Sequence, residues 1–429
     1  MTERLLQFIW QFQYFNRQFL LLESGEPFEI IHPGAFNSNQ GPDFQEARIR
    51  IGNTLWAGHV ELHIKASDWR RHRHTEDRNY GNVILHVVWE NDLAGAAGAI
   101  PVFSLRDRVP KVLLQQYEDW LNNGRFIPCG RQARTVSKLV WASWKERLLA
   151  ERLQRKASIV YACLLENNQH WDETCWWLLA RNFGIMVNAA TFECIARSLP
   201  LNLLSKHKNQ LHQLEALLLG QAGLLENHLW EDYGQMLIQE YAFYRKKYQL
   251  DPVRQPVHFL RMRPSSFPTV RLAQLAMLVH TSAHLFSSFK ETATLTGIRN
   301  LLSVTASSFW DNHYNFGELA RYKPKKLGSQ MIDNIIINTV VPLVFAWGQL
   351  HGEPLYTERT LQWLEEIGAE NNTITSSFKG IGIANHSAFD SQALIELKTM
   401  YCDQKKCLDC AVGNMLLKHS VTAEKLRAV

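Results

Sequence analysis

The sequence lacks the glycine-rich loops that bind nucleotide phosphates. Neither the Walker pattern GxxxxGK[ST] nor the dinucleotide pattern GxGxxG occurs in its 429 residues. The zinc-protease pattern HExxH is also absent, because no glutamate follows His280 in the pair His280 and His284. These absences argue against P-loop, Rossmann-type and zincin chemistry.

Long apolar runs are missing as well. No run approaches the ~18 apolar residues that a membrane-spanning helix needs. The densest stretch, 335–350, is interrupted by Asn338 and Pro342 and predicts a buried helix. The N-terminus lacks the basic segment, apolar core and small-residue cleavage site of a secretory signal. We therefore expect a cytoplasmic protein that does not insert into a membrane.

Charge is moderate in amount and only slightly unbalanced. The net charge is +5 and the pI is about 8.7, which permits nucleic-acid binding without requiring it. Hydrophobic residues make up 46% and charged residues 20%, as in packed globular proteins. The length predicts two or three domains.

Hydrophobic periodicity separates an α/β first part from a helical remainder. The predicted elements of the first part are a helix over 3–20, strands over 28–31, 48–51 and 55–64, a short helix or polar loop over 66–80, and strands over 83–89 and 100–104. Helical periods follow from residue 138 to about 420, such as 139–160 and 172–184. We expect an α+β fold with an α/β domain over 1–108, a connector over 109–135 that carries Cys129, and a mainly α-helical domain over 136–429.

The segment 41–65, GPDFQEARIRIGNTLWAGHVELHIK, carries the clearest chemistry. Asp43 ends a loop and opens a strand. Side chains alternate faces along a strand, so one face of the 55–64 strand carries a polar row that continues to the next residue: His59, Glu61, His63 and Lys65. Burying such a row is costly unless it serves a purpose.

Two carboxylates on adjacent strands suggest a metal site. Asp43 and Glu61 would hold Mg²⁺ or Mn²⁺, which prefer oxygen ligands, and the ion would polarise a phosphoryl oxygen and a bound water. His63 would orient this water, stabilise developing charge or act as a general base, and Lys65 would supply a cation. Two alternatives are a zinc site formed by His59, Glu61 and His63, and a purely structural set of capping and hydrogen-bonded side chains.

Pro42–Asp43 and Glu61–Leu62–His63 resemble the signature of the PD-(D/E)xK nuclease superfamily. That family has a helix, three strands, a helix and a strand, with an Asp at the start of the second strand and Glu-x-Lys on the third. The resemblance implies a restriction-endonuclease-like core and metal-dependent hydrolysis of DNA or RNA. His63 stands where the family has lysine, which leaves open an inactive nuclease fold that binds nucleic acid or acts as a scaffold. The family's optional first carboxylate would be Glu3.

The whole chain also resembles an uncharacterised bacterial family, domain of unknown function 2851. The segments GPDF, HVELHIKASDW and NVILHVVWEND and the C-terminal cysteines carry this resemblance. It spans nearly the full length and supports a single unit, but it implies no reaction.

A basic and aromatic segment follows the polar strand. Its candidate substrate-binding residues are Trp69, Arg70, Arg71, His72 and His74. The cationic side chains would contact phosphates and the indole would stack on a base. The alternatives are a solvated loop, or metal binding by the two histidines. His86 lies in the apolar strand over 83–89, so we expect it to be a buried core histidine rather than a ligand.

Cysteines cluster near the C-terminus at metal-ligand spacing. Cys402, Cys407 and Cys410 offer three thiolates, and Cys129, in the loop FIPCG, is the best fourth candidate. Four thiolates are typical of a 4Fe–4S cluster or a structural Zn²⁺. In this combination of parts the chain resembles CRISPR-associated adaptation nucleases and recombination helicase–nuclease subunits, which also use a distant fourth cysteine. Free thiols or a redox disulfide, unusual in the cytosol, are the alternatives.

Overall fold

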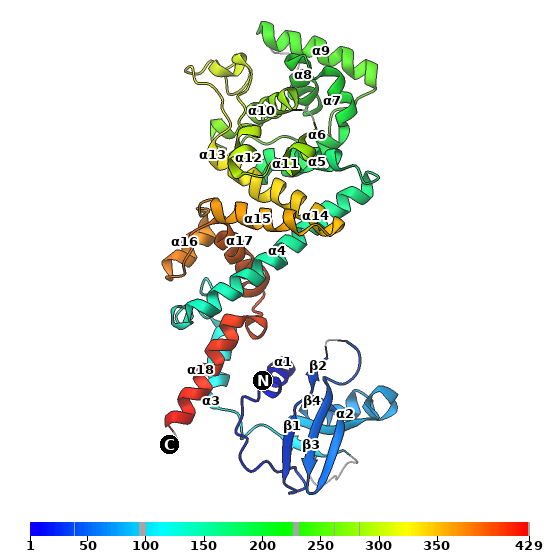
Figure 1. The fold of residues 1–429 in the computed structure, drawn as a ribbon, viewed down its shortest axis with the longest axis vertical. Helices are drawn as coiled ribbons and strands as arrows, with labels where there is room; N and C mark the ends of the chain where they lie inside the picture. The colour runs from blue at the N-terminus through cyan, green and yellow to red at the C-terminus, as the bar shows by residue number, and fades with distance from the viewer. Residues whose placement is uncertain (38, 94–99, 226–230, 261, 283, 428–429) are drawn as a thin grey trace. The chain divides into compact units, whose positions relative to one another are not determined.

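The computed structural model describes residues 1–37, 39–93, 100–225, 231–260, 262–282 and 284–427 (Figure 1). It confirms the α+β class. The chain forms two compact units. Unit 1 comprises Met1–Lys145, Ser376–Ile383 and Ile395–Val429, and unit 2 comprises Glu146–Thr375 and Ala384–Leu394. The unit that contains the sheet therefore extends past the expected boundaries at 108 and 135 and includes two segments from late in the chain.

A six-stranded mixed sheet forms the N-terminal part of unit 1. Its order is β1-β3-β4-β5-β6, with the short β2 paired to β3. β3 runs antiparallel to β1 and β4, whereas β4, β5 and β6 are parallel. The strands are β1 (Phe28–His32), β2 (Ala35–Phe36), β3 (Phe44–Ile51), β4 (Thr54–Lys65), β5 (Val83–Glu90) and β6 (Val102–Ser104).

The sequence predicted these strands except the two-residue β2, because their side chains follow the expected burial. β5 lies between two strands, and its first six residues are all buried, which explains why it reads as a continuous apolar run. β3 begins at Phe44, four residues before the predicted start at residue 48. The prediction missed these residues because buried and exposed side chains do not alternate strictly before Arg48.

The first helix is shorter than predicted. α1 (Glu3–Gln11) begins after Thr2, whose side chain accepts a hydrogen bond from the Leu5 amide. The helix then ends, because Gln13 adopts a left-handed conformation with φ of 55°. The apolar residues that follow are buried from irregular chain, as Phe15 is. Helical spacing of apolar residues alone did not fix the length of the helix.

The connection between β4 and β5 is built from short helical turns. They are α2 (Asp68–Arg71), η1 (His74–Glu76) and η2 (Arg78–Tyr80). Asp68 is buried and accepts a hydrogen bond from the Lys65 amide, while Asp92 accepts two from Ser67. These carboxylates attach the connection to the ends of β4 and β5.

The end of the chain completes unit 1. Its remaining elements are α3 (Lys111–Asn122), η3 (Ala133–Thr135), η7 (Leu397–Cys402), η8 (Cys407–Asp409) and α18 (Ala411–Arg427). The C-terminal elements contact the start of the chain, since Arg4 pairs with Asp409 at 2.5 Å and the Tyr14 hydroxyl donates to Asn414 at 2.8 Å. Residues four hundred positions apart therefore pack within one unit.

Unit 2 is helical and has a polar network in its core. Its helices are α5 (Trp171–Phe183), α6 (Ile185–Ser198), α7 (Leu201–His207), α8 (Leu211–Gln221), α9 (Asp232–Tyr248), α10 (Pro268–Thr281), α11 (Leu285–Glu291), α12 (Leu295–Leu301), α13 (Ser329–Ile335), α14 (Val341–His351) and α15 (Pro354–Glu366). The helices α4 (Lys138–Glu166), α16 (Thr373–Gly380) and α17 (Ala388–Glu396) cross the limits of the units along the chain. Glu215 is fully buried and accepts hydrogen bonds from Tyr233 at 2.8 Å and Trp310 at 3.0 Å.

One continuous helical stretch, Ser329–His351, is long and apolar enough to cross a bilayer by length and composition. However, 78% of its apolar window is buried inside the protein, as is typical of a core helix. The π-helical turn η6 (Ile336–Val340) precedes Pro342, which lacks an amide hydrogen. The helix therefore continues through the two residues that interrupt its apolar pattern.

Candidate metal centre

The central strand β4 directs two potential ligands to one place. Glu61 and His63 point to the same face of the strand and are 5% and 1% exposed. Just before them, the pairing of β4 with β3 shifts between Phe44 and Ala47, and its pairing with β5 shifts between His59 and Val60. Such irregularities bend a strand and re-aim its side chains, and they are common next to active sites.

The connection after β4 adds two more histidines. His72 ends α2 and His74 begins η1, with Arg73 between them in a left-handed conformation, φ 58° and ψ 31°. This conformation costs a non-glycine residue about 1–2 kcal/mol. It reverses the chain locally, so that both neighbouring imidazoles reach His63. Strain of this kind is concentrated at functional sites.

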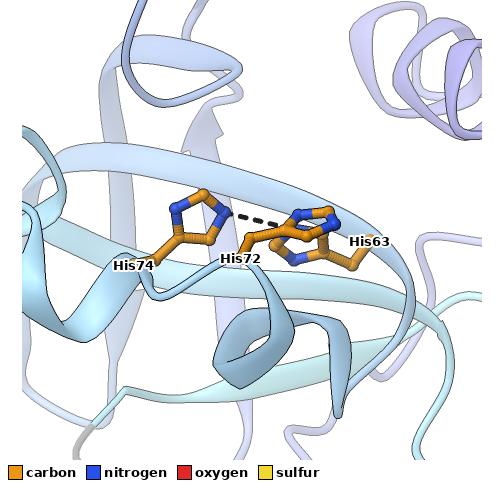
Figure 2. A group of neighbouring side chains, drawn as sticks. All are labelled: His63, His72 and His74. Atoms are coloured by element: carbon orange, nitrogen blue, oxygen red, sulfur yellow. Dashed lines mark hydrogen bonds between the residues drawn. The ribbon is translucent and has the colours of Figure 1, made fainter.

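Three imidazoles converge at this point, and the Glu61 carboxylate lies beside two of them. The His63 Nε2 atom lies 3.1 Å from His72 Nδ1, 3.3 Å from His74 Nε2 and 3.6 Å from Glu61 Oε1. The distance from His74 Nε2 to Glu61 Oε1 is 3.5 Å. Figure 2 shows the three imidazole rings gathered together, with the bond from His74 to His63 dashed.

The ligand atoms of His63, His72 and His74 lie within 4.8 Å of one another, and the four separations given above are close to those between ligands of a single ion. A tetrahedral ion that binds its ligands at ~2.0–2.1 Å keeps the ligand atoms about 3.3 Å apart. Pairwise hydrogen bonding does not explain the arrangement, because one imidazole nitrogen can donate or accept but cannot satisfy three such neighbours at once. The residues Glu61, His63, His72 and His74 are called the histidine centre below.

His86 of β5 supports this centre from behind. Its Nε2 atom lies 2.9 Å from His63 Nδ1, and the residue is 4% exposed. If Nε2 of His63 is a metal ligand, its proton is on Nδ1 and is donated to His86. Burial is the main cause that lowers the pKa of His63 to about 2 and that of His86 to about 4, so both are neutral near pH 7. Neutral imidazole is the form that binds metals.

Asp43 holds Glu61 in place at the edge of the centre. Its amide donates to Glu61 Oε2 at 3.0 Å, and its carboxylate accepts from the Leu62 amide at 3.1 Å and from Gln7 at 2.8 Å. Burial raises the pKa of Asp43 to about 7 and that of Glu61 to about 8, and at Glu61 the Asp43 charge adds to the rise. Positive charge supplied by a bound cation would oppose both shifts.

Glu3 and Tyr80 also belong to the surroundings of the centre. The charge of Glu3 raises the pKa of Asp43 and of Glu61. The Tyr80 ring stacks on His74 at 3.8 Å, and burial together with the Glu61 and Asp43 charges raises its pKa to about 12. Only the nuclease resemblance had drawn attention to Glu3. Nothing in the local sequence singles out a tyrosine in a polar loop.

The other residues expected at the site lie around this centre. Lys65 is exposed, and its backbone amide donates to Asp68. The Trp69 indole donates to Thr75 at 3.1 Å, and its ring packs on His74 and His86 at 5.2 and 5.1 Å.

The two arginines are at the surface, and His59 lies apart. Arg70 is exposed, and Arg71, with 70% of its side chain exposed, pairs with Asp68 at 3.0 Å. His59 is outside the histidine centre, and its Nδ1 atom has no hydrogen-bond partner among the described residues. The structure thus groups His72 and His74, and not His59, with Glu61 and His63.

The four clustered cysteines come together elsewhere in unit 1. Cys129, Cys407 and Cys410 are buried, and Cys402 is half-buried. Each of the four is close enough to the other three for thiolate charge on one to raise the pKa of another. Of the remaining thiols, Cys163 and Cys175 are buried and Cys194 is half-buried.

The fold and this site define an α+β protein with a cluster of three histidines, His63, His72 and His74, beside the central strand of a mixed sheet. Residues 3–373 match the family described as Protein of unknown function (DUF2851), and the chain belongs to that family. No curated protein and no solved structure matches it.

Proposed function

We propose that the protein is a metal-dependent phosphodiesterase of the nuclease type, and that Glu61, His63, His72 and His74 hold its catalytic ion. The grouping of the three imidazoles, with Glu61 Oε1 at 3.6 Å from His63 and 3.5 Å from His74, carries the proposal. The proposed ligand set, three nitrogens and one oxygen, differs from the pair of carboxylates, Asp43 and Glu61, that the sequence predicted. Imidazole suits zinc and its first-row neighbours better than magnesium, so Zn²⁺ is the first ion to test, before Mn²⁺ and Mg²⁺.

The surroundings of the centre support a phosphate ester as the substrate. Arg70 and Arg73 are exposed and lie within two residues of the exposed His72 along the chain, so two cations are available near the site. Arginine binds phosphate oxygens through charged, often bidentate, hydrogen bonds. The slightly basic pI of 8.7 is compatible with a nucleic acid.

The arrangement of the sheet supports the nuclease resemblance. If the two-residue β2 and the short turns η1 and η2 are set aside, the order α1, β1, β3, β4, α2, β5 matches the helix, three strands, helix and strand of the PD-(D/E)xK family. Asp43 stands before β3, the second principal strand, and Glu61 lies on β4, the third. We accordingly propose a restriction-endonuclease-like core in which histidines replace the usual lysine chemistry.

Different residues of the chain would bind the ion, position its ligands and bind phosphate. A bound divalent ion supplies a polarised water and positive charge near the phosphate. Asp43 and His86 act as positioning residues for Glu61 and His63, respectively. The Tyr80 phenol is protonated at neutral pH, and burial raises its pKa further, to about 12, so it can donate a hydrogen bond to a phosphate oxygen. Arg70 and Arg73 bind the flanking phosphates.

The test uses the full-length protein, stripped of metal and reloaded separately with Zn²⁺, Mn²⁺ and Mg²⁺. Hydrolysis is measured on bis(p-nitrophenyl) phosphate and on single- and double-stranded DNA and RNA. We expect metal-dependent cleavage that falls to the metal-free level in His74→Ala and Glu61→Gln. The matched control is His59→Gln, which changes a histidine of the same strand outside the centre and should keep full activity.

Two results would contradict the proposal. One is a metal-loaded wild type as inactive as Glu61→Gln on every substrate, while still binding nucleic acid; this would favour the non-catalytic binding protein. The other is cleavage that survives His74→Ala unchanged, which would place the chemistry elsewhere.

A further inference from the structure

A second group of metal-ligand side chains lies in unit 1, outside the histidine centre. It is made of Cys129, in the loop after α3, and of Cys402, Cys407 and Cys410, which surround η8 near the C-terminus. All four are free thiols. We propose that Cys129, Cys402, Cys407 and Cys410 together bind one iron–sulfur cluster. The proposal is independent of the phosphodiesterase function.

The first support is that the fold gathers all four thiols, although one is far away in the sequence. The Cys129 loop is fixed locally, because its carbonyl accepts hydrogen bonds from the Gln132 and Ala133 amides at 2.9 and 3.0 Å. The C-terminal segment is attached to the same region, since the Lys405 ammonium donates to the Leu121 carbonyl at the end of α3. All six pairs among the four thiols interact electrostatically.

The second support is that this environment suits thiolates. The backbone amides of Val412 and Gly413, at the start of α18, donate towards the Cys410 sulfur. Lys405 lies close enough to Cys407 to favour its charged form. Amide donors and a nearby cation stabilise negative sulfur ligands, and hydrogen bonds to the sulfurs are a recurring feature of iron–sulfur sites.

The third support is the close packing of the chain around the thiols. A Cβ atom on Gly413 would lie 2.1 Å from the Cys407 carbonyl oxygen, so only glycine allows α18 to start against the cysteine loop.

The spacing of the thiols favours a cluster over a single ion. Around one zinc ion, four thiolates lie about 3.8 Å apart. In the described part of the chain, the ligand atoms of His63, His72 and His74 all lie within 4.8 Å of one another. No three of the described cysteine sulfurs lie that close together. A wider set of four thiolates fits a polynuclear cluster, and Cys402-x₄-Cys407-x₂-Cys410 has a spacing known from such clusters.

The experiment is metal and sulfide analysis of the full-length protein, purified without oxygen or reconstituted with iron and sulfide. We expect iron and acid-labile sulfide in equal amounts, a brown colour from thiolate-to-iron absorption, and a paramagnetic resonance signal after reduction. Cys407→Ser should lose iron, sulfide and colour. Cys163→Ser, which changes a similarly buried thiol outside the group, should keep them. His74→Ala should also keep them, which separates this group from the histidine centre.

Three outcomes would overturn the assignment. They are a chain that holds zinc without sulfide, a reconstituted wild type that holds neither iron nor sulfide, and iron content that is unchanged in Cys407→Ser. Because Cys407→Ser can also destabilise unit 1, the sulfide content and resonance spectrum of the wild type decide the matter even where that variant does not fold.

Discussion

The hydrogen bond between His63 and His86 offers the sharpest test of the histidine centre. His86 touches no ligand position itself and acts only through the Nδ1 atom of His63, at 2.9 Å. We expect His86→Leu to weaken binding of Zn²⁺ 10- to 100-fold, the usual effect of losing such a partner, which corresponds to about 1.4–2.7 kcal/mol. Leucine leaves a buried imidazole N–H without an acceptor and frees the ring to turn.

The assay is competition of the metal-stripped protein against a coloured zinc chelator, with urea denaturation of the metal-free variants measured in parallel. His86→Gln is the matched control, because its side-chain carbonyl can accept the same hydrogen bond. It should recover most of the affinity that leucine loses. A purely structural role would lower the stability of both variants without separating their affinities.

The reasoning fails if His86→Leu binds zinc as tightly as the wild type, or if the glutamine and leucine variants are equally weak while remaining equally folded. Either result would mean that the ring of His63 is not oriented through Nδ1. The grouping of these side chains would then need an explanation other than a coordination shell.

The remaining predictions concern stability and substrate binding. Burial raises the pKa of Glu215 above 4.5, so the folded protein keeps a proton that the unfolded chain loses. The free energy of unfolding should therefore fall as the pH rises above that value. Urea titrations at several pH values should show a smaller fall for Glu215→Gln, and an equal fall in both proteins would refute the prediction. Gly220→Ala should destabilise unit 2 by about 1–3 kcal/mol, because the new Cβ would lie 2.2 Å from the Tyr241 ring; an unchanged melting temperature would contradict it. Arg73→Gly keeps the left-handed turn but removes a proposed phosphate contact. It should weaken nucleic-acid binding, lower the slope of log binding constant against log salt concentration by about 1, and leave zinc affinity unchanged. An unaltered slope would show that Arg73 is not part of the binding surface.

The sequence predicted the parts of the site that depend on strand periodicity. The two-residue repeat of β4 is strict enough to place Glu61 and His63 on one face, whatever the surroundings. The short loop that precedes β3 likewise places Asp43 beside them, and its hydrogen bonds with Glu61 and Leu62 follow from that position. Cysteine spacing predicted which thiols would lie near one another, and these four do come together in unit 1.

The rest of the site depends on conformations that local sequence does not encode. His72 and His74 meet only because Arg73 adopts a left-handed conformation, which arginine rarely does without tertiary support. His86 was expected to be a core histidine, and it is indeed buried in the sheet. Its partner His63, however, is on another strand, and only the register of β4 against β5 brings the two together.

The division of the chain was also beyond sequence reasoning. A change from strand to helix periodicity suggested a boundary at residue 108, but compactness depends on which distant segments return. Arg4 pairs with Asp409, and the Tyr14 hydroxyl donates to Asn414. No sequence pattern near either end of the chain predicts these two contacts.

The discontinuity of unit 1 has a consequence for biosynthesis. About 250 residues separate Lys145 from Ile395, where the main returning segment begins, and ribosomes need roughly 12–50 seconds to add them. During that interval α3 and the Cys129 loop have been translated without the segment that covers them. Until then Arg4 and Tyr14 also lack their partners Asp409 and Asn414, so unit 1 cannot be completed before translation of the chain is nearly finished.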